Sequence, residues 1–247
     1  MKTYRYLIAA ILLLFTSLAH AQYRDTEEDE FMYKSEFVGG INFNTIGGLI
    51  GGVYFKYARA LTPKMLHSFS LEIVNVKHPK EERYQNILTG GTFIPGKKNY
   101  LYGLRPQYGR EFILFKKARE RGVQVDFITA IGPTLGVVAP YLIEIEEDMG
   151  GGIRRVRVVP NSGNIQNARI LGTGSFFESL SKSKIQWGTS LKLAMSFEFG
   201  AFKSNVTGVE AGFMLDKYFD EIEIMEFAKN RSVYTSAFLT IYFGVRK

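Results

Sequence analysis

Cysteine is absent from the 247 residues of the chain. A disulfide framework is therefore excluded, and so is a lipid anchor attached to a cysteine at a processing site. Histidine is scarce as well, with 3 residues in the whole chain. The folded protein must be held together by packing and polar contacts rather than by covalent bridges.

Long hydrophobic runs are also missing after residue 21. A helix needs about 20 consecutive apolar residues to cross the hydrocarbon core of a bilayer. Lipid satisfies no backbone hydrogen bonds, so any insertion of the remaining chain into a membrane requires a closed β-sheet. The chain is nevertheless 46% hydrophobic, which excludes a charge-rich disordered protein and leaves the globular and membrane classes.

The first residues have the order of an export signal. Two basic residues precede a short apolar run, and small residues follow at positions 19 and 21. This order is typical of a cleavable signal peptide, and the run is too short for a transmembrane anchor. We predict a signal peptide at 1–21, cut before Gln22, and an acidic periplasmic N-terminal segment at 22–35.

The charge balance argues against nucleic acid as a partner. The chain has 31 basic and 24 acidic residues, a net charge of +7. Loss of Lys2 and Arg5 with the signal peptide lowers 31 to 29, so the mature chain carries +5. This mild excess comes with no Arg-rich helix and no aromatic stacking motif, and we predict no binding of nucleic acid.

Apolar and polar residues alternate in eight segments of the mature chain. Successive side chains of a strand point to opposite faces, so a half-buried strand shows a period of two. In the clearest segments, 187–201 and 234–245, an unbroken apolar face opposes a polar one. The eight predicted strands are 36–45, 49–61, 65–77, 100–111, 123–137, 187–201, 209–216 and 234–245.

The polar face of these segments is rich in Gly, Ser, Ala and Thr, with isolated charges of both signs. Small residues suit the narrow interior of an eight-stranded barrel. A basic side chain facing lipid near the bilayer midplane would cost about 2–4 kcal/mol. We therefore predict that the polar face points inward, with these charges inside the barrel: Lys56, Glu72, Arg105, Glu111, Asp126, Lys192, Glu198, Glu210 and Asp216.

The lengths of the connections favour a membrane barrel. The long connections, 78–98 and 143–184, fall on the side of the predicted sheet opposite both termini. Outer-membrane barrels combine short periplasmic turns with long external loops in this way. The predicted fold is all-β: an eight-stranded antiparallel up-and-down transmembrane β-barrel over residues 36–247, in a bacterial outer membrane. A soluble periplasmic lipocalin-like barrel, which would hide the apolar face inside, is the alternative.

Eight strands, an N-terminal signal, the parity of the loops and a final strand ending in Tyr242-Phe243 resemble the small OmpA/OmpX-like family of outer-membrane barrels. The resemblance covers roughly residues 36–247 and is architectural. The sequence departs from the family pattern where residues 244–247 follow the terminal aromatic. The chain is also similar in style to barrels that accompany larger outer-membrane machines such as type IX secretion, without matching diagnostic residues.

Residues that could carry catalysis or bind metal are few. The mature chain retains His67 and His78, near opposite ends of one predicted strand, so we predict neither a metal site nor a cofactor. His67 and Ser68 could supply half of a nucleophilic pair, because such pairs combine Ser and His. An outer-membrane lipid-modifying enzyme is thus a second hypothesis beside a non-enzymatic barrel.

The segment 143–184 offers a candidate surface for a protein partner. Ser175 and Glu178 have the spacing of a capping box at the start of a short helix. An apolar loop of this kind either marks an interaction surface or folds down over the mouth of the barrel. We predict a structural or scaffolding subunit of an envelope complex, whose partners are membrane lipids and other outer-membrane or periplasmic proteins. The candidate contact residues are Ile170, Leu171, Phe176, Phe177 and Leu180.

Overall fold

The structure is a computed structural model that describes residues 35–87, 89–116, 122–148, 153–160, 169–199 and 205–246. The chain divides into two units, Met1–Phe31 and Met32–Lys247, and every described residue belongs to the second. The predicted signal peptide and all of the acidic N-terminal segment except its last residue lie outside the described ranges.

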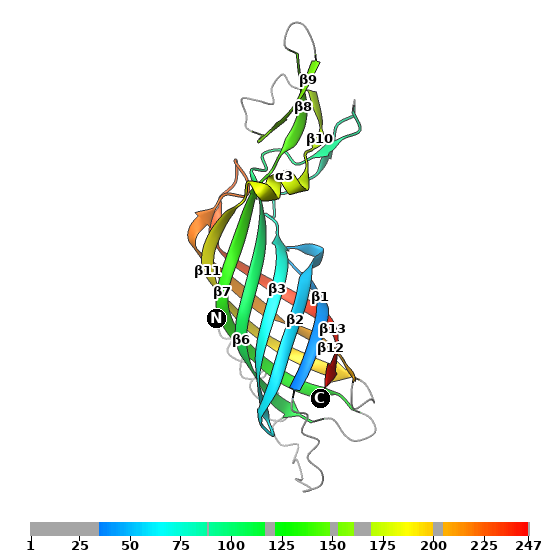
Figure 1. Ribbon diagram of the computed structural model, residues 1–247, viewed down its shortest axis with the longest axis vertical. Helices are drawn as coiled ribbons and strands as arrows, with labels where there is room; N and C mark the ends of the chain where they lie inside the picture. Colours follow the sequence, from blue (N-terminus) through cyan, green and yellow to red (C-terminus); the bar gives the residue numbers. More distant parts are fainter. Residues whose placement is uncertain are drawn as a thin grey trace, which may run out of the picture. The chain divides into compact units, whose positions relative to one another are not determined.

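Eight long strands close into a single barrel (Figure 1). Their order around the barrel is β1-β13-β12-β11-β7-β6-β3-β2, and each neighbouring pair is antiparallel. The predicted fold class is therefore confirmed. The strands are β1 (Ser35–Asn44), β2 (Gly48–Thr62), β3 (Met65–Val76), β6 (Asn99–Phe115), β7 (Gln124–Pro140), β11 (Lys184–Phe199), β12 (Asn205–Ile222) and β13 (Arg231–Arg246).

Several strands are longer than the alternation of the sequence predicts. The pattern marks only residues 209–216 of β12, whereas the strand has 18 residues. Beyond Leu215 the outward positions hold Lys217, Phe219 and Glu221, so charged residues interrupt the apolar stripe. Backbone pairing with β13 continues past that point, because hydrogen bonding along a ladder does not depend on which side chains face outward.

The connections give the barrel two different ends. At one end, here called the turn end, β2 is followed by β3, β6 by β7 and β11 by β12, and β1 starts and β13 ends there as well. At the other, the loop end, lie the described residues of the connections 45–47, 77–98, 141–183 and 223–230. Within the described ranges, no helix has the length and apolar character needed to span a bilayer.

The two longest connections fold into a small substructure at the loop end, here called the cap (the described residues of 77–98 and 141–183; Figure 1). A three-stranded antiparallel sheet in the order β10-β8-β9 lies beside a two-stranded sheet of β4 and β5. Its elements are β4 (Tyr84–Gln85), β5 (Thr92–Phe93), β8 (Ile143–Asp148), β9 (Ile153–Val158), β10 (Arg169–Thr173) and α3 (Phe176–Ser181).

Side chains fill the inside of the barrel near the loop end. Tyr218 is fully buried there, in an apolar cluster with Val74, Leu101 and Tyr234. Gly136 makes room for this ring, because a Cβ at that position would lie 2.7 Å from a ring carbon of Tyr218. Small residues on the polar face thus admit large ones from across the barrel, as expected in a narrow eight-stranded interior.

Candidate functional site: the filled interior and the cap

A network of five charged side chains occupies the middle of the barrel. Lys192 Nζ lies 2.6 Å from a carboxylate oxygen of Glu72 and 2.6 Å from one of Glu210. Arg105 donates to Asp216 from Nε at 2.9 Å, and to Glu72 at 3.4 Å. The five side chains come from β3, β6, β11 and β12, so the network ties strands across the barrel. All five are at most 2% exposed.

Aromatic rings complete the surroundings of Lys192. Its Nζ lies 4.4 Å from the ring centroid of Tyr54 and 4.9 Å from that of Phe238. Cations are attracted to the faces of such rings, and the attraction grows where water is excluded. The ammonium group therefore has carboxylates and ring faces in place of its hydration shell.

A second network lies nearer the turn end. Lys56 Nζ lies 3.0 Å from Glu36 and 2.9 Å from Glu111. Arg246 contacts both Glu36, at 3.0 Å, and Glu198. Because Glu36 belongs to β1 and Arg246 to β13, this network joins the first and last strands, where the barrel closes.

The nine interior charges that the sequence predicts are all buried in the structure, at 0–6% exposure. Eight of them lie in the two networks, and Asp126 instead accepts hydrogen bonds from Gln124 at 3.0 Å. Sequence reasoning missed Glu36 and Arg246. Both lie on the polar face by parity: Glu36 is the first residue of the predicted strand 36–45, and Arg246 lies one residue beyond the predicted strand 234–245.

The outer wall of the barrel is apolar. Phe213, Ile131 and Leu193 are 71%, 61% and 45% exposed, whereas their neighbours along each strand point inward and are more buried. In water such a continuous apolar surface would be unfavourable, while in lipid it is matched. The fold is that of a small outer-membrane β-barrel. A lipocalin-like barrel would have the opposite orientation of faces, so that alternative is wrong.

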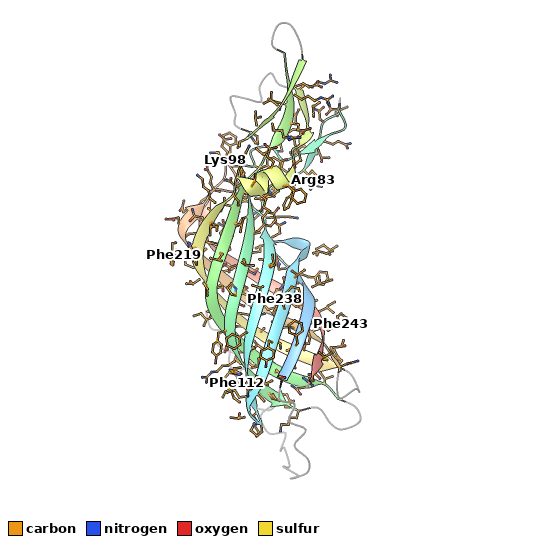
Figure 2. The ribbon with its side chains drawn as sticks, in the orientation of Figure 1. Arg83, Lys98, Phe112, Phe219, Phe238 and Phe243 are labelled. Atoms are coloured by element: carbon orange, nitrogen blue, oxygen red, sulfur yellow. The ribbon has the colours of Figure 1, made fainter. Side chains whose placement is uncertain are left out.

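Aromatic side chains lie near both ends of the outer wall. Phe219 lies towards the cap and Phe112 towards the turn end (Figure 2). Trp187, the single tryptophan of the chain, is 57% exposed on the outer face of β11 near its loop end. Aromatic girdles at the two interfaces are typical of membrane barrels.

Comparison with solved structures gives similar architectures at low sequence identity. Ail, the attachment invasion locus protein of Yersinia pestis, has a TM-score of 0.42 and 11% identity, covering 88% of this chain and 100% of that one. Neisserial surface protein A has a TM-score of 0.39 and 7% identity, covering 87% and 97%. OprG of Pseudomonas aeruginosa has a TM-score of 0.33 and 8% identity, covering 87% and 96%. No family model and no curated protein matches the sequence.

The cap has a hydrophobic core of its own. Tyr141, Ile143, Ile145 and Ile170 are buried together, with Phe93 packed against them from the other long connection. The Tyr141 hydroxyl accepts a hydrogen bond from the Ile94 backbone N–H at 2.9 Å. The two connections therefore fold as one unit rather than as separate loops.

The connection 223–230, also at the loop end, is hydrogen-bonded to this unit as well. The backbone N–H groups of Lys98 and Glu226 donate to Ile224 and Gly96 carbonyls, at 2.9 and 2.7 Å. Nearby, Lys97 Nζ lies 2.5 Å from Glu81 and 4.4 Å from the ring centroid of Tyr100. Burial lowers the pKa of Lys97, and the contact with Glu81 partly offsets this effect.

The candidate partner-binding residues separate into two groups. Ile170 is buried in the core of the cap and Leu171 is half-buried, so neither offers a free surface. Phe176, Phe177 and Leu180 on α3 are 48%, 79% and 39% exposed. The Phe176 ring packs edge to face on Tyr102, which faces outward on β6, with centroids 5.9 Å apart.

Helix α3 forms where the sequence predicts a short helix, but the predicted capping box does not form. Ser175 is the N-cap residue in extended conformation, yet its side chain makes no capping hydrogen bond. The Glu178 carboxylate instead binds Lys182 at 3.0 Å and Arg157 of β9 at 2.9 Å. These cations lower the pKa of Glu178, the hydrogen bond from Lys182 having the largest effect.

The two histidines of the described chain do not assemble with other catalytic groups. His67 faces outward beside Phe69, whereas Ser68 is 3% exposed and points into the barrel, so the two side chains lie on opposite faces of the wall. His78 accepts a hydrogen bond from the Lys80 backbone in the cap. Among the residues that the structure describes, no group of three His, Cys, Asp or Glu side chains could hold a metal ion.

Proposed function

We propose that this protein is a non-enzymatic, structural or scaffolding subunit of an envelope complex, anchored in a bacterial outer membrane after removal of residues 1–21. The cap carries the proposal. The cap has a buried core and is hydrogen-bonded to the connection 223–230, so it is a folded platform. The interior of the barrel is occupied by two charge networks and an apolar cluster, which favours anchoring over conduction.

The proposed contact surface is the exposed face of α3, centred on Phe177. An aromatic side chain that is 79% exposed on a folded support suits a hot spot for a partner protein. Association with a larger machine such as a secretion apparatus belongs to the same proposal.

Phe177→Ser tests this function in native membranes. We expect the variant to lose at least about tenfold of its co-purifying protein, the loss typical of a hot-spot truncation. Because the Phe177 side chain is exposed, the variant should still fold. A change of its gel mobility on heating would show that the barrel is intact. Phe227→Ser, which removes a phenylalanine that is 73% exposed in the connection 223–230, is the matched control. Unchanged recovery of partners with Phe177→Ser would contradict the proposal.

A further inference from the structure

Three basic side chains lie in a row across the outer wall, near the turn end. Arg59 of β2 pairs directly with His67 of β3, which pairs in turn with Arg110 of β6. Each basic residue has a neighbour in the chain that points inward and is at most 3% exposed. These neighbours are Ala58, Ser68 and Glu111. Alternation therefore directs all three basic side chains, here called the basic row, away from the interior.

The basic row borders an aromatic row on the same wall. Tyr57, Phe69 and Tyr108 occupy the next outward positions and pair with one another in the same order. They are 44%, 55% and 40% exposed. The His67 ring lies 6.0 Å from Phe69 and 6.4 Å from Tyr108, centroid to centroid. Aromatic residues of this kind mark the boundary between acyl chains and headgroups.

The position of the row on the strands agrees with that boundary. Arg59 and His67 flank the turn 63–64, three and two residues from the ends of their strands. Phe112, the next outward residue after Arg110, lies towards the turn end in Figure 2. A basic side chain costs about 0–1 kcal/mol at the interface, against about 2–4 kcal/mol near the midplane. The row is thus placed at headgroup depth.

The basic row has no carboxylate beside it on its own wall. No outward residue of β2, β3, β6 or β7 is acidic, and the structure describes each of these strands in full. Inside the barrel, by contrast, cations are placed against carboxylates, as Lys56 is against Glu36 and Glu111. Among the described residues, the basic row thus has no counter-charge on the outer wall, and its position is open to an anionic group of the surrounding membrane.

We propose that the basic row binds the phosphate of an anionic phospholipid in the leaflet at the turn end. Guanidinium groups match phosphate oxygens in a bidentate geometry. The acyl chains of the same lipid would lie along the outward residues that continue from the row, first Tyr57 and Phe69 and then Phe55 and Leu71. This continuity with the apolar wall identifies the occupant as a lipid rather than a soluble anion. The inference rests on the membrane placement of the barrel.

The test measures which lipids stay bound to the barrel. The full chain is folded into vesicles of equal phosphatidylglycerol and phosphatidylcholine, extracted gently, and examined by native mass spectrometry. We expect retained phosphatidylglycerol to exceed phosphatidylcholine by about tenfold, the ratio expected of one charge-assisted contact. The double variant Arg59→Gln/Arg110→Gln should bring the ratio close to one, and Arg59→Lys/Arg110→Lys should retain much of the preference.

A control variant removes the same charge elsewhere. Arg155→Gln/Arg169→Gln takes two exposed guanidinium groups from the cap, and the lipid ratio should stay that of the unaltered protein. If the double glutamine variant fails to fold, each single Arg→Gln variant should still lower the ratio part-way.

Three results would overturn the inference. The unaltered protein could show no preference for phosphatidylglycerol, or Arg59→Gln/Arg110→Gln could keep that preference. The control Arg155→Gln/Arg169→Gln could also lose the preference to the same extent as Arg59→Gln/Arg110→Gln. A dimer of the unaltered chain that dissociates in the glutamine variant would assign the row to protein contact instead. If the unaltered chain does not insert into vesicles at all, the membrane placement fails first.

Discussion

Each buried charge in the barrel depends on partners from other strands. Asp216 accepts two hydrogen bonds from Arg105, while Glu72 is shared between Arg105 and Lys192. Removing one member of a buried ion pair leaves an uncompensated charge, which is far more costly than removing the whole pair. The networks therefore fix which strands face one another, and their effect is expected to show in single substitutions.

Arg105→Met tests this dependence. We expect the free energy of unfolding to fall by about 3–5 kcal/mol, because Asp216 loses its partner in a dry environment. Urea unfolding of the barrel in lipid vesicles measures the change. Adding Asp216→Asn to Arg105→Met should recover a large part of the loss. Equal stability of the single variant and the unaltered protein would contradict the role given to the network.

The alternation of side chains made most of the interior charges predictable. A charge at the end of a strand, where the alternation stops, was harder to predict. Lys192 and Glu198 stand in an unbroken alternation, so their inward direction follows from the sequence alone. Arg246 comes after the terminal aromatic, where the alternation is nearly finished, and only the pairing Glu36↔Arg246 shows that the ladder continues. Which carboxylate meets which cation depends on barrel closure and stagger, which a single sequence does not encode locally.

The strands of the cap were missed although their signal is present in the sequence. In β8, Ile143 and Ile145 alternate with Glu144 and Glu146, a pattern that the charge run 144–148 obscures. The facing strand β9 places Arg157 and Arg155 opposite those two carboxylates. Strands of 6 residues give little periodicity, and pairing of opposite charges across strands becomes visible only once the partner is known.

Glu178 joins the helix of the cap to its sheet, and Glu178→Gln tests that contact. We expect amide exchange in 176–181 to quicken by about two- to fivefold at neutral pH, the scale of an exposed ion pair. Hydrogen exchange read by mass spectrometry measures it. Glu82, in the connection 77–98, accepts a hydrogen bond from the Tyr84 hydroxyl at 3.2 Å, so Glu82→Gln is the matched control and should leave 176–181 unchanged. Equal exchange in 176–181 for Glu178→Gln and the unaltered protein would contradict the contact.

The same contact has a defined pH dependence. Hydrogen bonds from Lys182 and Arg157 lower the pKa of Glu178 below its ordinary value of 4.5. A carboxylate with a lowered pKa contributes fully above the ordinary value, and the contribution is lost as the pH falls through the lowered one. The difference between Glu178→Gln and the unaltered protein should therefore disappear in acid.

At the scale of the whole molecule, the two ends of the barrel differ in what they meet. The loop end carries a folded cap with exposed aromatic side chains, and the turn end carries the closing network and the basic row. Between them runs an apolar wall around a charged interior. A single arrangement of faces thus accounts for the membrane anchoring, the filled interior and the exposure of the cap.

The single tryptophan allows this arrangement of faces to be measured without any substitution. Trp187 faces outward at the loop end of β11, so its fluorescence reports one site on the outer wall. In vesicles of brominated phospholipid the emission should be strongly quenched, and the aqueous quencher acrylamide should have little effect. Strong quenching by acrylamide, with none by the brominated acyl chains, would place the outer wall in water and contradict the account.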